Sequence, residues 1–554
     1  MKKLGLILLL FSLIGLLFAQ HNSNRKIFTK ADTLRGSLTK ERSCFDVRYY
    51  SLQLDRIDLG SKYIGGKVRM LADVVEPTSR IQLDLFPELE VKSVTSYGKE
   101  VKWDREEYLF YVNLEKEYQV DEKLDIEVVY GGKARIAENA PWDGGLTWTL
   151  DEYKRPWVAV SCQGIGASIW WPNKDHLSDE PDSMDVRLVK VNKDMWSISN
   201  GTFMGLETIG NAEYFHYKIS YPINNYNVAM YVGHYSHFED SVLNGGKKLD
   251  LDYWVIRGNE DKAKKQFSIV PEMLTCFEEY FGPYPFHKDG FALVEAPFAG
   301  MEHQSAIAYG NNYMTGYLGA DYSGIGLDFD FIIVHEAGHE YWGNSVSMSD
   351  ICDMWIHEGF CTYAEVLYVE CKYGYDKALD YIKFKEFLVE GKETLITPAG
   401  VNAQPTGDVY SKGALFLNTL RYIADDQKMF FEVLKNIQTK YAYKNISTED
   451  VLNEFNEVYK RDLRVIFDVY LNQVSLPTLN YMVHFKNKKA NLYARWLNVP
   501  EGFVMPVWFT YQNKQYKVEV GAKNYELLVE KVNLKKLKWL DKLQYVKYSY
   551  AGVK

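Results

Sequence analysis

Near the middle of the sequence, two histidines and a glutamate have the spacing of a metal site. His335, Glu336 and His339 form the pattern H-E-x-x-H. Positions four apart share one face of a helix, so both imidazoles can bind one ion with the glutamate beside it. A catalytic zinc ion needs three protein ligands and an open fourth position, and Glu358 begins the next helical stretch. We therefore predict one Zn²⁺ per chain, bound by His335, His339 and Glu358.

An accidental match is the simplest alternative to a metal site. The pattern should arise by chance in about one chain in a hundred of this length, usually on a solvated helix surface. Here an apolar run comes directly before the first histidine and anchors this stretch in a core: Phe329, Phe331, Ile332 and Ile333. We therefore interpret the pattern as a metal site.

Three further motifs accompany the histidine pattern, in a fixed order along the chain. Glu358 follows His339 after 18 residues. The other motifs are Cys162-Gln163-Gly164 with Trp171-Pro172, the run Ala299-Gly300-Met301-Glu302-His303, and the run Val409-Tyr410-Ser411-Lys412-Gly413. Together they resemble the substrate-amine segment, the G-A/G-M-E-N exopeptidase motif and the Y-x-K-G stretch of the aminopeptidase N and leukotriene hydrolase family of zinc metallopeptidases. The resemblance covers about residues 44–475.

The resemblance implies roles at the reacting bond. Glu336 would be the general base, taking a proton from the attacking water and passing it to the leaving amine. Tyr410 would donate a hydrogen bond to the oxyanion of the tetrahedral intermediate. The zinc ligands implied are the three predicted above.

The resemblance also implies how a peptide substrate would be held. Glu302, together with Gln163, would hold the free α-amino group, and backbone groups at Gly300 and Met301 would align the peptide as an added strand. A free α-amine is mostly protonated near neutral pH, so a carboxylate is its natural partner. Restriction to the first peptide bond would then follow from Glu302 rather than from the metal.

Three residues depart from the family pattern. Ala299 replaces the first glycine of the exopeptidase motif, His303 replaces its asparagine, and His357 stands where an asparagine usually precedes the glutamate ligand. Neither histidine falls at a ligand position, so we expect both to support the site or the fold. His303 bears on how strictly the site selects a free amine.

The function predicted on this basis is a zinc-dependent aminopeptidase acting on peptides with a free N-terminus. Two alternatives keep the same fold and metal: a relative that hydrolyses an epoxide, and an endopeptidase. A zinc-binding pseudoenzyme or scaffold is the alternative outside the enzymes. Its mark would be the loss of a ligand or of Glu336, and all of these residues are present.

The surrounding pattern predicts a multidomain α+β protein. Alternating apolar residues, such as Leu124, Ile126 and Val128, predict an N-terminal β-sandwich or saddle-like sheet over residues 44–256. Helical spacing then predicts a mostly helical catalytic domain over residues 257–475, which the resemblance implies to be thermolysin-like. Strand-like alternation returns in residues 476–554 and predicts a small C-terminal β domain.

The first residues have the features of an export signal. Lys2 and Lys3 precede an apolar run from Leu4 to Phe18, so residues 1–19 are predicted to be a secretory signal peptide. Residues 20–43 are polar and predict a flexible lead-in. No later segment is long and apolar enough to span a bilayer. We expect an exported protein, periplasmic or extracellular and soluble after cleavage, without stable membrane insertion.

Charge and cysteine content narrow the partners further. The net charge is −10 and no long stretch is strongly basic, so a nucleic-acid partner is not expected. Six cysteines in 554 residues do not form a disulfide framework, and no C-x-x-C pair suggests thiolate ligands. The sequence leaves the pairing of these cysteines open.

Overall fold

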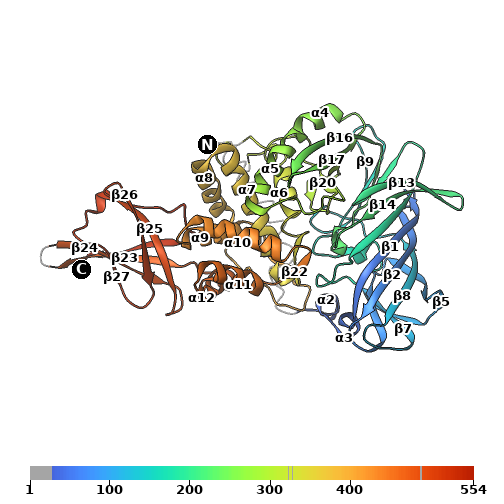
Figure 1. The fold of residues 1–554 in the computed structure, drawn as a ribbon, viewed down its shortest axis with the longest axis horizontal. Helices are drawn as coiled ribbons and strands as arrows, with labels where there is room; N and C mark the ends of the chain where they lie inside the picture. Colours follow the sequence, from blue (N-terminus) through green and yellow to red (C-terminus); the bar gives the residue numbers. More distant parts are fainter. Residues whose placement is uncertain (1–27, 322, 327, 487–488, 554) are drawn as a thin grey trace.

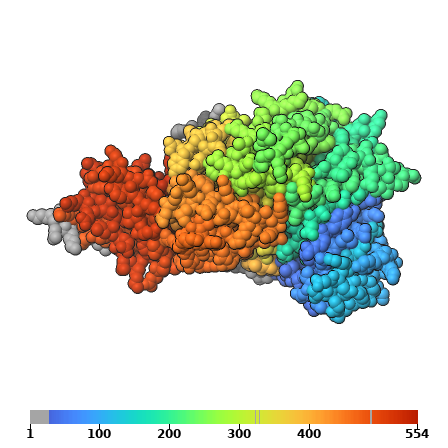
Figure 2. Space-filling model, viewed as in Figure 1, coloured from blue at the N-terminus to red at the C-terminus, as the bar shows by residue number. Residues whose placement is uncertain are grey.

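The computed structural model describes residues 28–321, 323–326, 328–486 and 489–553. The predicted signal peptide and the first part of the predicted lead-in lie outside these residues. The molecule is elongated: N-terminal strands lie at one end, C-terminal strands at the other, and helices between them (Figures 1 and 2). The predicted multidomain α+β architecture is therefore confirmed.

The N-terminal region is built from three sheets. The largest has eight strands, and two smaller sheets have three and four strands. The large sheet has the order β13 (Thr202–Ile209), β14 (Ala212–Ile219), β11 (Ser183–Val189), β1 (Phe45–Asp58), β2 (Tyr63–Val74), β8 (Lys123–Gly132), β4 (Leu89–Ser96) and β5 (Lys99–Glu100). The three-stranded sheet contains β3 (Thr78–Asp84), β7 (Leu109–Tyr118) and β6 (Trp103–Glu106). The four-stranded sheet contains β12 (Trp196–Ile198), β15 (Tyr231–Gly233), β10 (Pro156–Ser161) and β9 (Gly145–Leu150). The predicted alternation is confirmed in β8, where Leu124, Ile126 and Val128 are buried.

The described part of the predicted lead-in has regular structure. It forms two short helices, α2 (Lys30–Gly36) and α3 (Lys40–Ser43). A capping box at Thr29 and Asp32 begins the first helix. Arg42 is fully buried and forms an ion pair with Asp84 of β3 at 2.7 Å. This buried pair fixes the segment to the N-terminal sheets.

A five-stranded sheet begins the catalytic region. Its order is β16 (Tyr235–Asn244), β17 (Lys247–Ile256), β18 (Phe291–Glu295), β20 (Ile307–Tyr309) and β19 (Gly300–Met301). Strands β16 and β17 lie before the predicted boundary at residue 256, yet β17 pairs with β18 beyond it. We therefore propose that the catalytic domain begins between Gly233 and Tyr235. Strand β19, which carries the exopeptidase motif, lies at the edge of this sheet.

The helices of the catalytic region pack against this sheet and against one another. They are α4 (Glu260–Gln266), α5 (Val270–Phe281), α6 (Phe331–His339), α7 (Trp355–Tyr373), α8 (Tyr375–Lys385), α9 (Asp408–Ile423), α10 (Gln427–Lys440), α11 (Thr448–Tyr459) and α12 (Arg464–Leu471). Two short strands, β21 (Val346–Met348) and β22 (Lys444–Ile446), pair in parallel between them. A disulfide joins Cys276 of α5 to Cys371 of α7. In the described part of the chain, no helix combines the length and the apolar character needed to cross a membrane.

Two facing sheets form the C-terminal region. One has the order β27 (Glu526–Val529), β24 (Lys489–Leu497), β23 (Thr478–Lys486) and β29 (Lys547–Val553). The other has the order β26 (Lys514–Gly521), β25 (Val504–Tyr511) and β28 (Leu537–Trp539). Trp496 and Phe509 are buried in its core. Asn418 of α9 donates to the backbone carbonyls of Lys542 and Leu543, which joins this region to the helices.

Helices α7 and α9 approach each other closely at two glycines. A Cβ atom on Gly413 would lie 2.8 Å from the Cα atom of Gly359, and one on Gly359 would lie 3.1 Å from the Cα atom of Gly413. Gly359 follows Glu358, and Gly413 lies one helical turn after Tyr410. The absence of side chains at this crossing therefore sets how close Tyr410 lies to the predicted metal ligand.

The Gly413→Ala variant should be less stable, because the new methyl group meets backbone that cannot move aside. We expect the free energy of unfolding to fall by about 1–3 kcal/mol, as for other overpacked cores. Thermal unfolding followed by circular dichroism would measure this as a lower midpoint. Gly407→Ala, just before the same helix, is the control, because a Cβ atom there meets nothing within 4 Å. An equal loss in both variants would contradict the packing argument.

Candidate metal centre and peptide site

The three predicted metal ligands meet where the C-terminal half of helix α6 approaches the first turn of helix α7. The Nε2 atoms of His335 and His339 lie 3.3 Å apart, and each lies 3.4 Å from Oε2 of Glu358. All three side chains are buried. Among the described residues, Oε2 of Glu358 has no hydrogen-bond partner although it is buried.

This triangle fits a tetrahedral zinc ion. Zinc binds histidine nitrogen and carboxylate oxygen at about 2.0–2.1 Å, which puts neighbouring ligand atoms about 3.3 Å apart in a tetrahedron. The measured separations agree with that edge length, and the orphaned oxygen of Glu358 supplies the third corner. The residues therefore fit the predicted ion.

A second layer of side chains orients the two histidines. Nδ1 of His335 lies 2.8 Å from Oε1 of Glu365, and Nδ1 of His339 lies 3.0 Å from the carbonyl oxygen of Trp342. These acceptors favour a proton on Nδ1, which leaves Nε2 free for an ion. Glu365 also accepts hydrogen bonds from Tyr381 and from Lys385, the latter at 2.9 Å.

Sequence reasoning missed Glu365, although a signal was available. It follows Glu358 by seven residues, or two helical turns, and so lies on the same face of α7. A second carboxylate at this spacing lies on the same buried face of the helix. It therefore indicates a hydrogen-bond partner for one of the ligand histidines.

The site carries an excess of buried negative charge. Four carboxylates surround the two histidines: Glu302, Glu336, Glu358 and Glu365. Burial raises the pKa of Glu336 to about 8, with nearby Glu302 and Glu358 adding to the increase and both histidines opposing it. Burial lowers the pKa of His335, but its contacts with Glu358 and Glu365 outweigh this and raise the pKa to about 10. A divalent cation between these groups would offset the excess.

The predicted amine-binding residues lie beside the metal triangle. Nε2 of Gln163 donates to Oε1 of Glu302 at 2.6 Å and to Oε1 of Glu358 at 2.7 Å. Glu302 is almost fully buried, and burial raises its pKa. Carboxylate oxygens of Glu302 and Glu336 also lie within 4.8 Å of a ring nitrogen of His339. One amide thus joins the predicted amine anchor to a predicted metal ligand.

The edge strand β19 carries this anchor past the predicted base. Gly300 has no room for a side chain, because a Cβ atom there would lie 2.4 Å from Oε1 of Glu336. Met301 is buried, and its carbonyl oxygen accepts the N–H of His303 at 2.9 Å. The strand therefore brings the backbone of Gly300 directly against the Glu336 carboxylate.

Two side chains at the end of the HExxH helix hold the loop that follows β19. Glu340 accepts the N–H of Ser305 at 2.8 Å, and Asn344 donates to the carbonyl oxygen of Glu302 at 3.0 Å. Ser305 has a φ of 55°, a conformation that costs energy for a residue with a side chain. The sequence analysis did not predict these residues. Glu340 caps the end of α6 and Asn344 lies beyond it in a turn, so no helical spacing indicated this pair.

Tyr410 lies at the beginning of α9 and faces the same centre. Its ring stacks on that of His335, with 5.8 Å between centroids. Burial raises its pKa well above the usual value, with the charges of Glu358 and Glu302 adding to the effect. The phenol therefore stays protonated and remains a hydrogen-bond donor. All nine predicted site residues lie around one centre.

The two histidines that depart from the family pattern are not ligands in this arrangement. Nδ1 of His303 lies 2.5 Å from the hydroxyl of Tyr231, and Nε2 of His357 accepts the N–H of Met348 at 2.8 Å. Burial lowers the pKa of each to about 3, so both rings stay neutral. Their contacts support the interpretation that they hold neighbouring chain segments.

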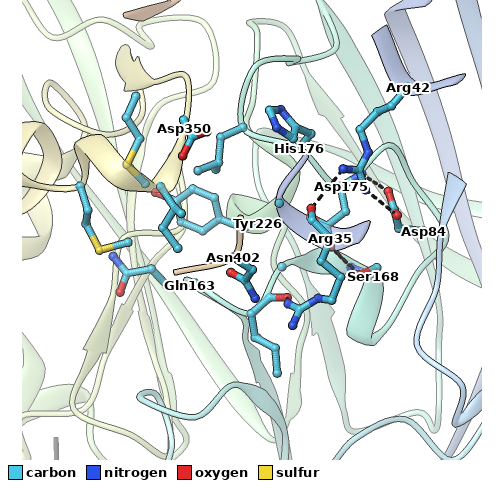
Figure 3. Close-up of a pocket in the computed structure, with 18 residues that line it drawn as sticks. Arg35, Arg42, Asp84, Gln163, Ser168, Asp175, His176, Tyr226, Asp350 and Asn402 are labelled. Carbon is cyan, nitrogen blue, oxygen red and sulfur yellow. Dashed lines mark hydrogen bonds and ion pairs between the residues drawn. The ribbon is translucent and has the colours of Figure 1, made fainter. Parts of the chain in front are cut away.

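A small cavity of about 70 Å³ lies behind Gln163 and Tyr226 (Figure 3). Arg35, from helix α2, reaches into its wall and donates to the carbonyl oxygen of Ile165 at 2.5 Å. The arginine also lies over the rings of Phe86 and Tyr108. Part of the segment predicted as a lead-in thus lines the cavity beside the glutamine predicted to bind the amine.

Comparison with known proteins agrees with this arrangement. Residues 265–470 match the model of the peptidase family M1 domain. The chain is 23% identical over 495 residues to a probable aminopeptidase 1 of Sulfurisphaera tokodaii, covering 85% of this chain and 58% of that protein. It is 24% identical over 439 residues to aminopeptidase B of Mus musculus, covering 71% of this chain and 62% of that protein. The chain thus spans less than two thirds of either relative.

A solved structure also has the same fold. It is a mutant M1 zinc metallopeptidase from Deinococcus radiodurans, bound to a Tyr-Ser-Ala substrate. It superimposes with a TM-score of 0.66 at 21% identity, covering 78% of this chain and 95% of that one. The middle of the chain is therefore similar to the peptidase family M1 domain, and the chain shares its fold with a solved M1 zinc metallopeptidase.

Replacing the second-layer carboxylate should weaken metal binding. In Glu365→Gln, the acceptor for His335 loses its charge, and the ion pair between Glu365 and buried Lys385 is lost. We expect the affinity for zinc to fall about 10–100-fold, measured by competition with a chromophoric chelator. Glu370→Gln, on the same helix but bonded to Arg421 instead, is the control. Unchanged affinity in Glu365→Gln would contradict the assigned orientation of His335.

Proposed function

We propose that the protein is a zinc-dependent aminopeptidase that hydrolyses the first peptide bond of peptides with a free N-terminus. One observation carries this proposal: the amide of Gln163 joins Glu302, on the edge strand, to Glu358, in the metal triangle. An amine held at Glu302 is therefore a short, fixed distance from the metal centre. Only the first peptide bond of a substrate can then reach that centre.

The buried carboxylate of Glu302 suits a protonated amine. Taken alone, it is a buried negative charge whose cost falls when a cation binds. The substrate ammonium supplies that cation, and the two oxygens of Glu302 can accept from it. Glu340 and Asn344 keep the loop in place, so the position of the amine is set before the substrate arrives.

Zinc, when bound by His335, His339 and Glu358, would make a bound water acidic and polarise the substrate carbonyl. Glu336 takes the proton of the attacking water, because its carboxylate lies beside the same centre. It then gives that proton to the leaving amine. A pKa raised by burial suits both steps, since the group can accept and return a proton near neutral pH.

Tyr410 stabilises the charge that develops on the carbonyl oxygen. Its protonated phenol faces the metal triangle from the start of α9, and donation to an oxyanion is strongest in a site that excludes water. Because Gly300 has no side chain, the edge strand β19 passes directly beside Glu336, where a substrate can pair with it. The other proposals of the sequence analysis, epoxide hydrolysis, an endopeptidase and a catalytically inactive binder, become outcomes of the tests below.

We also propose that the protein is exported. The predicted signal at residues 1–19 is one support, and the disulfide between Cys276 and Cys371 is a second. Structural disulfides persist in oxidising compartments and are rare in the cytosol.

The Glu336→Gln variant should keep its zinc and lose its turnover. The change removes the proton acceptor but leaves the three ligands and the side-chain shape. We expect kcat to fall about 10²–10⁴-fold, with metal content by elemental analysis unchanged. Retention of more than a tenth of the activity would remove Glu336 as the base. If the variant loses its zinc, the lower activity reports on metal binding and not on the role of Glu336 as the base.

Glu302 should select for the free amine. We expect the parent protein to release the first residue of a free peptide and to leave its N-acetylated form intact. Glu302→Gln should lower kcat/KM for the free peptide by roughly 10²-fold, since a charged hydrogen bond is lost from a buried site. Liquid chromatography of the products would measure both. Internal cleavage of both forms would indicate an endopeptidase, and no cleavage would favour the epoxide or inactive alternatives.

A further inference from the structure

The edge strand gives a bound peptide a direction. Glu302 follows the strand and Gly300 begins it, with the Glu336 carboxylate against Gly300. A substrate whose amine lies at Glu302, and whose first peptide bond lies at Glu336, runs from Glu302 towards Gly300. Its remaining residues must therefore leave past Ala299, Phe298 and Pro297.

These same residues line a large open cavity. The cavity has a volume of about 650 Å³, within the range of ligand pockets. One wall is formed by residues 296–299 and by the loop at residues 312–318. The facing wall comes from the N-terminal region, through residues 139–142 and the connection from β9 to β10, including Leu150 and Trp157. It is a groove between two parts of the molecule, continuous with the edge strand.

The length of the groove can be expressed in substrate residues. An extended peptide advances about 3.3 Å per residue, so the three positions from Gly300 back to Pro297 correspond to about 10 Å. If the first two residues of a substrate lie along β19, its third to fifth residues reach the groove.

The charged groups of the groove already have partners. Asp151 pairs with Arg155 at 2.7 Å, and Glu152 lies 3.3 Å from Lys262. Glu295 accepts hydrogen bonds from the N–H of Ile256, from Asn259 and from Tyr313. Partnered carboxylates contribute little attraction for a new charge.

Polar atoms make up more of the groove's exposed lining than apolar atoms, but three large apolar side chains remain exposed along it. Trp142, Leu150 and Leu318 have exposed fractions of 40%, 54% and 46%. Burying such surface against a ligand is favourable in proportion to the apolar area covered.

We infer that this groove binds the third to fifth residues of the peptide substrate and prefers apolar or aromatic side chains there. The inference rests on the proposed aminopeptidase function. Peptides of about five residues are then better substrates than dipeptides, because contacts remote from the reacting bond contribute to kcat/KM.

A length series tests the groove. Free peptides of two to seven residues, with one fixed N-terminal residue and phenylalanine at the fourth position where present, are hydrolysed by the zinc-loaded full chain. We expect kcat/KM to rise roughly tenfold from two to five residues and then to level off. Replacing the phenylalanine by serine removes most of the gain. A flat series overturns the inference.

Two variants locate the effect. Leu150→Ser and Leu318→Ser should each lower the pentapeptide-to-dipeptide ratio of kcat/KM several-fold. Leu206→Ser is the matched control, because this leucine of β13 is 50% exposed and lies outside the groove. A ratio unchanged in both groove variants, or lowered equally in the control, overturns the assignment.

Failure of the proposed function gives a different result. If no peptide loses its first residue, the aminopeptidase proposal fails. The groove can still be tested by measuring how tightly the same peptides, fluorescently labelled, bind to the zinc-loaded Glu336→Gln variant. Tighter binding of the pentapeptide supports it, and equal binding of two-residue and five-residue peptides overturns it.

Discussion

The packing of helix α6 against helix α7 determines whether this structure has a metal centre at all. It brings three ligand atoms to within 3.4 Å of one another, two from one helix and one from the other. A buried carboxylate beside two imidazole nitrogens is costly without a cation between them. Other side chains around the site hold these three ligands in place. Glu365 holds His335 from behind, and Lys385 partly offsets the charge of Glu365.

Close backbone approach is the second constraint, and glycines permit it at three places. Gly338 lies in α6 against Ala364 of α7, where an added Cβ atom would come within 3.3 Å of the alanine Cβ. Gly359 and Gly413 let α7 and α9 touch, and Gly300 lets the edge strand pass Glu336. Each of these close approaches brings a predicted functional residue near the three predicted metal ligands. The motifs around these groups therefore contain glycine for reasons of packing as well as of chemistry.

Local spacing made much of this predictable. The HExxH pattern depends on helix geometry alone, and the alternation in β8 depends only on strand geometry. Glu358 was predicted from its place in the next helical stretch and from the family spacing. What escaped prediction depends on contacts between distant segments. The pairing of β17 with β18 places β17 in the same sheet as β18, but the alternation within a strand does not reveal which sheet it joins. Cys276 and Cys371 are 95 residues apart, so no spacing rule could join them.

The helical structure of the lead-in segment was not predicted from the sequence for a related reason. Its helices are short and polar, and what orders them is Arg42 buried against Asp84, 42 residues away. Glu340 and Asn344 were missed because their partners are backbone groups, N–H of Ser305 and C=O of Glu302, which leave no mark in a sequence. Side-chain chemistry could thus be predicted at the triangle, whereas the groups that position it could not.

The two ends of the proposed peptide site differ in a way that suits removal of a single residue. The cavity lined by Gln163 holds only about 70 Å³, and the end of α2 and the loop from Gln163 to Gly166 form part of its wall. Beyond Gly300 the space widens to about 650 Å³ between two regions of the molecule. In the proposed site, the smaller space at this end favours the first residue of a peptide, with its amine at Glu302, over an extended chain. Selection of the terminal bond would then depend on the narrow end as well as on the carboxylate, and the buried Arg42–Asp84 pair, which fixes the segment carrying α2, would contribute to that selection.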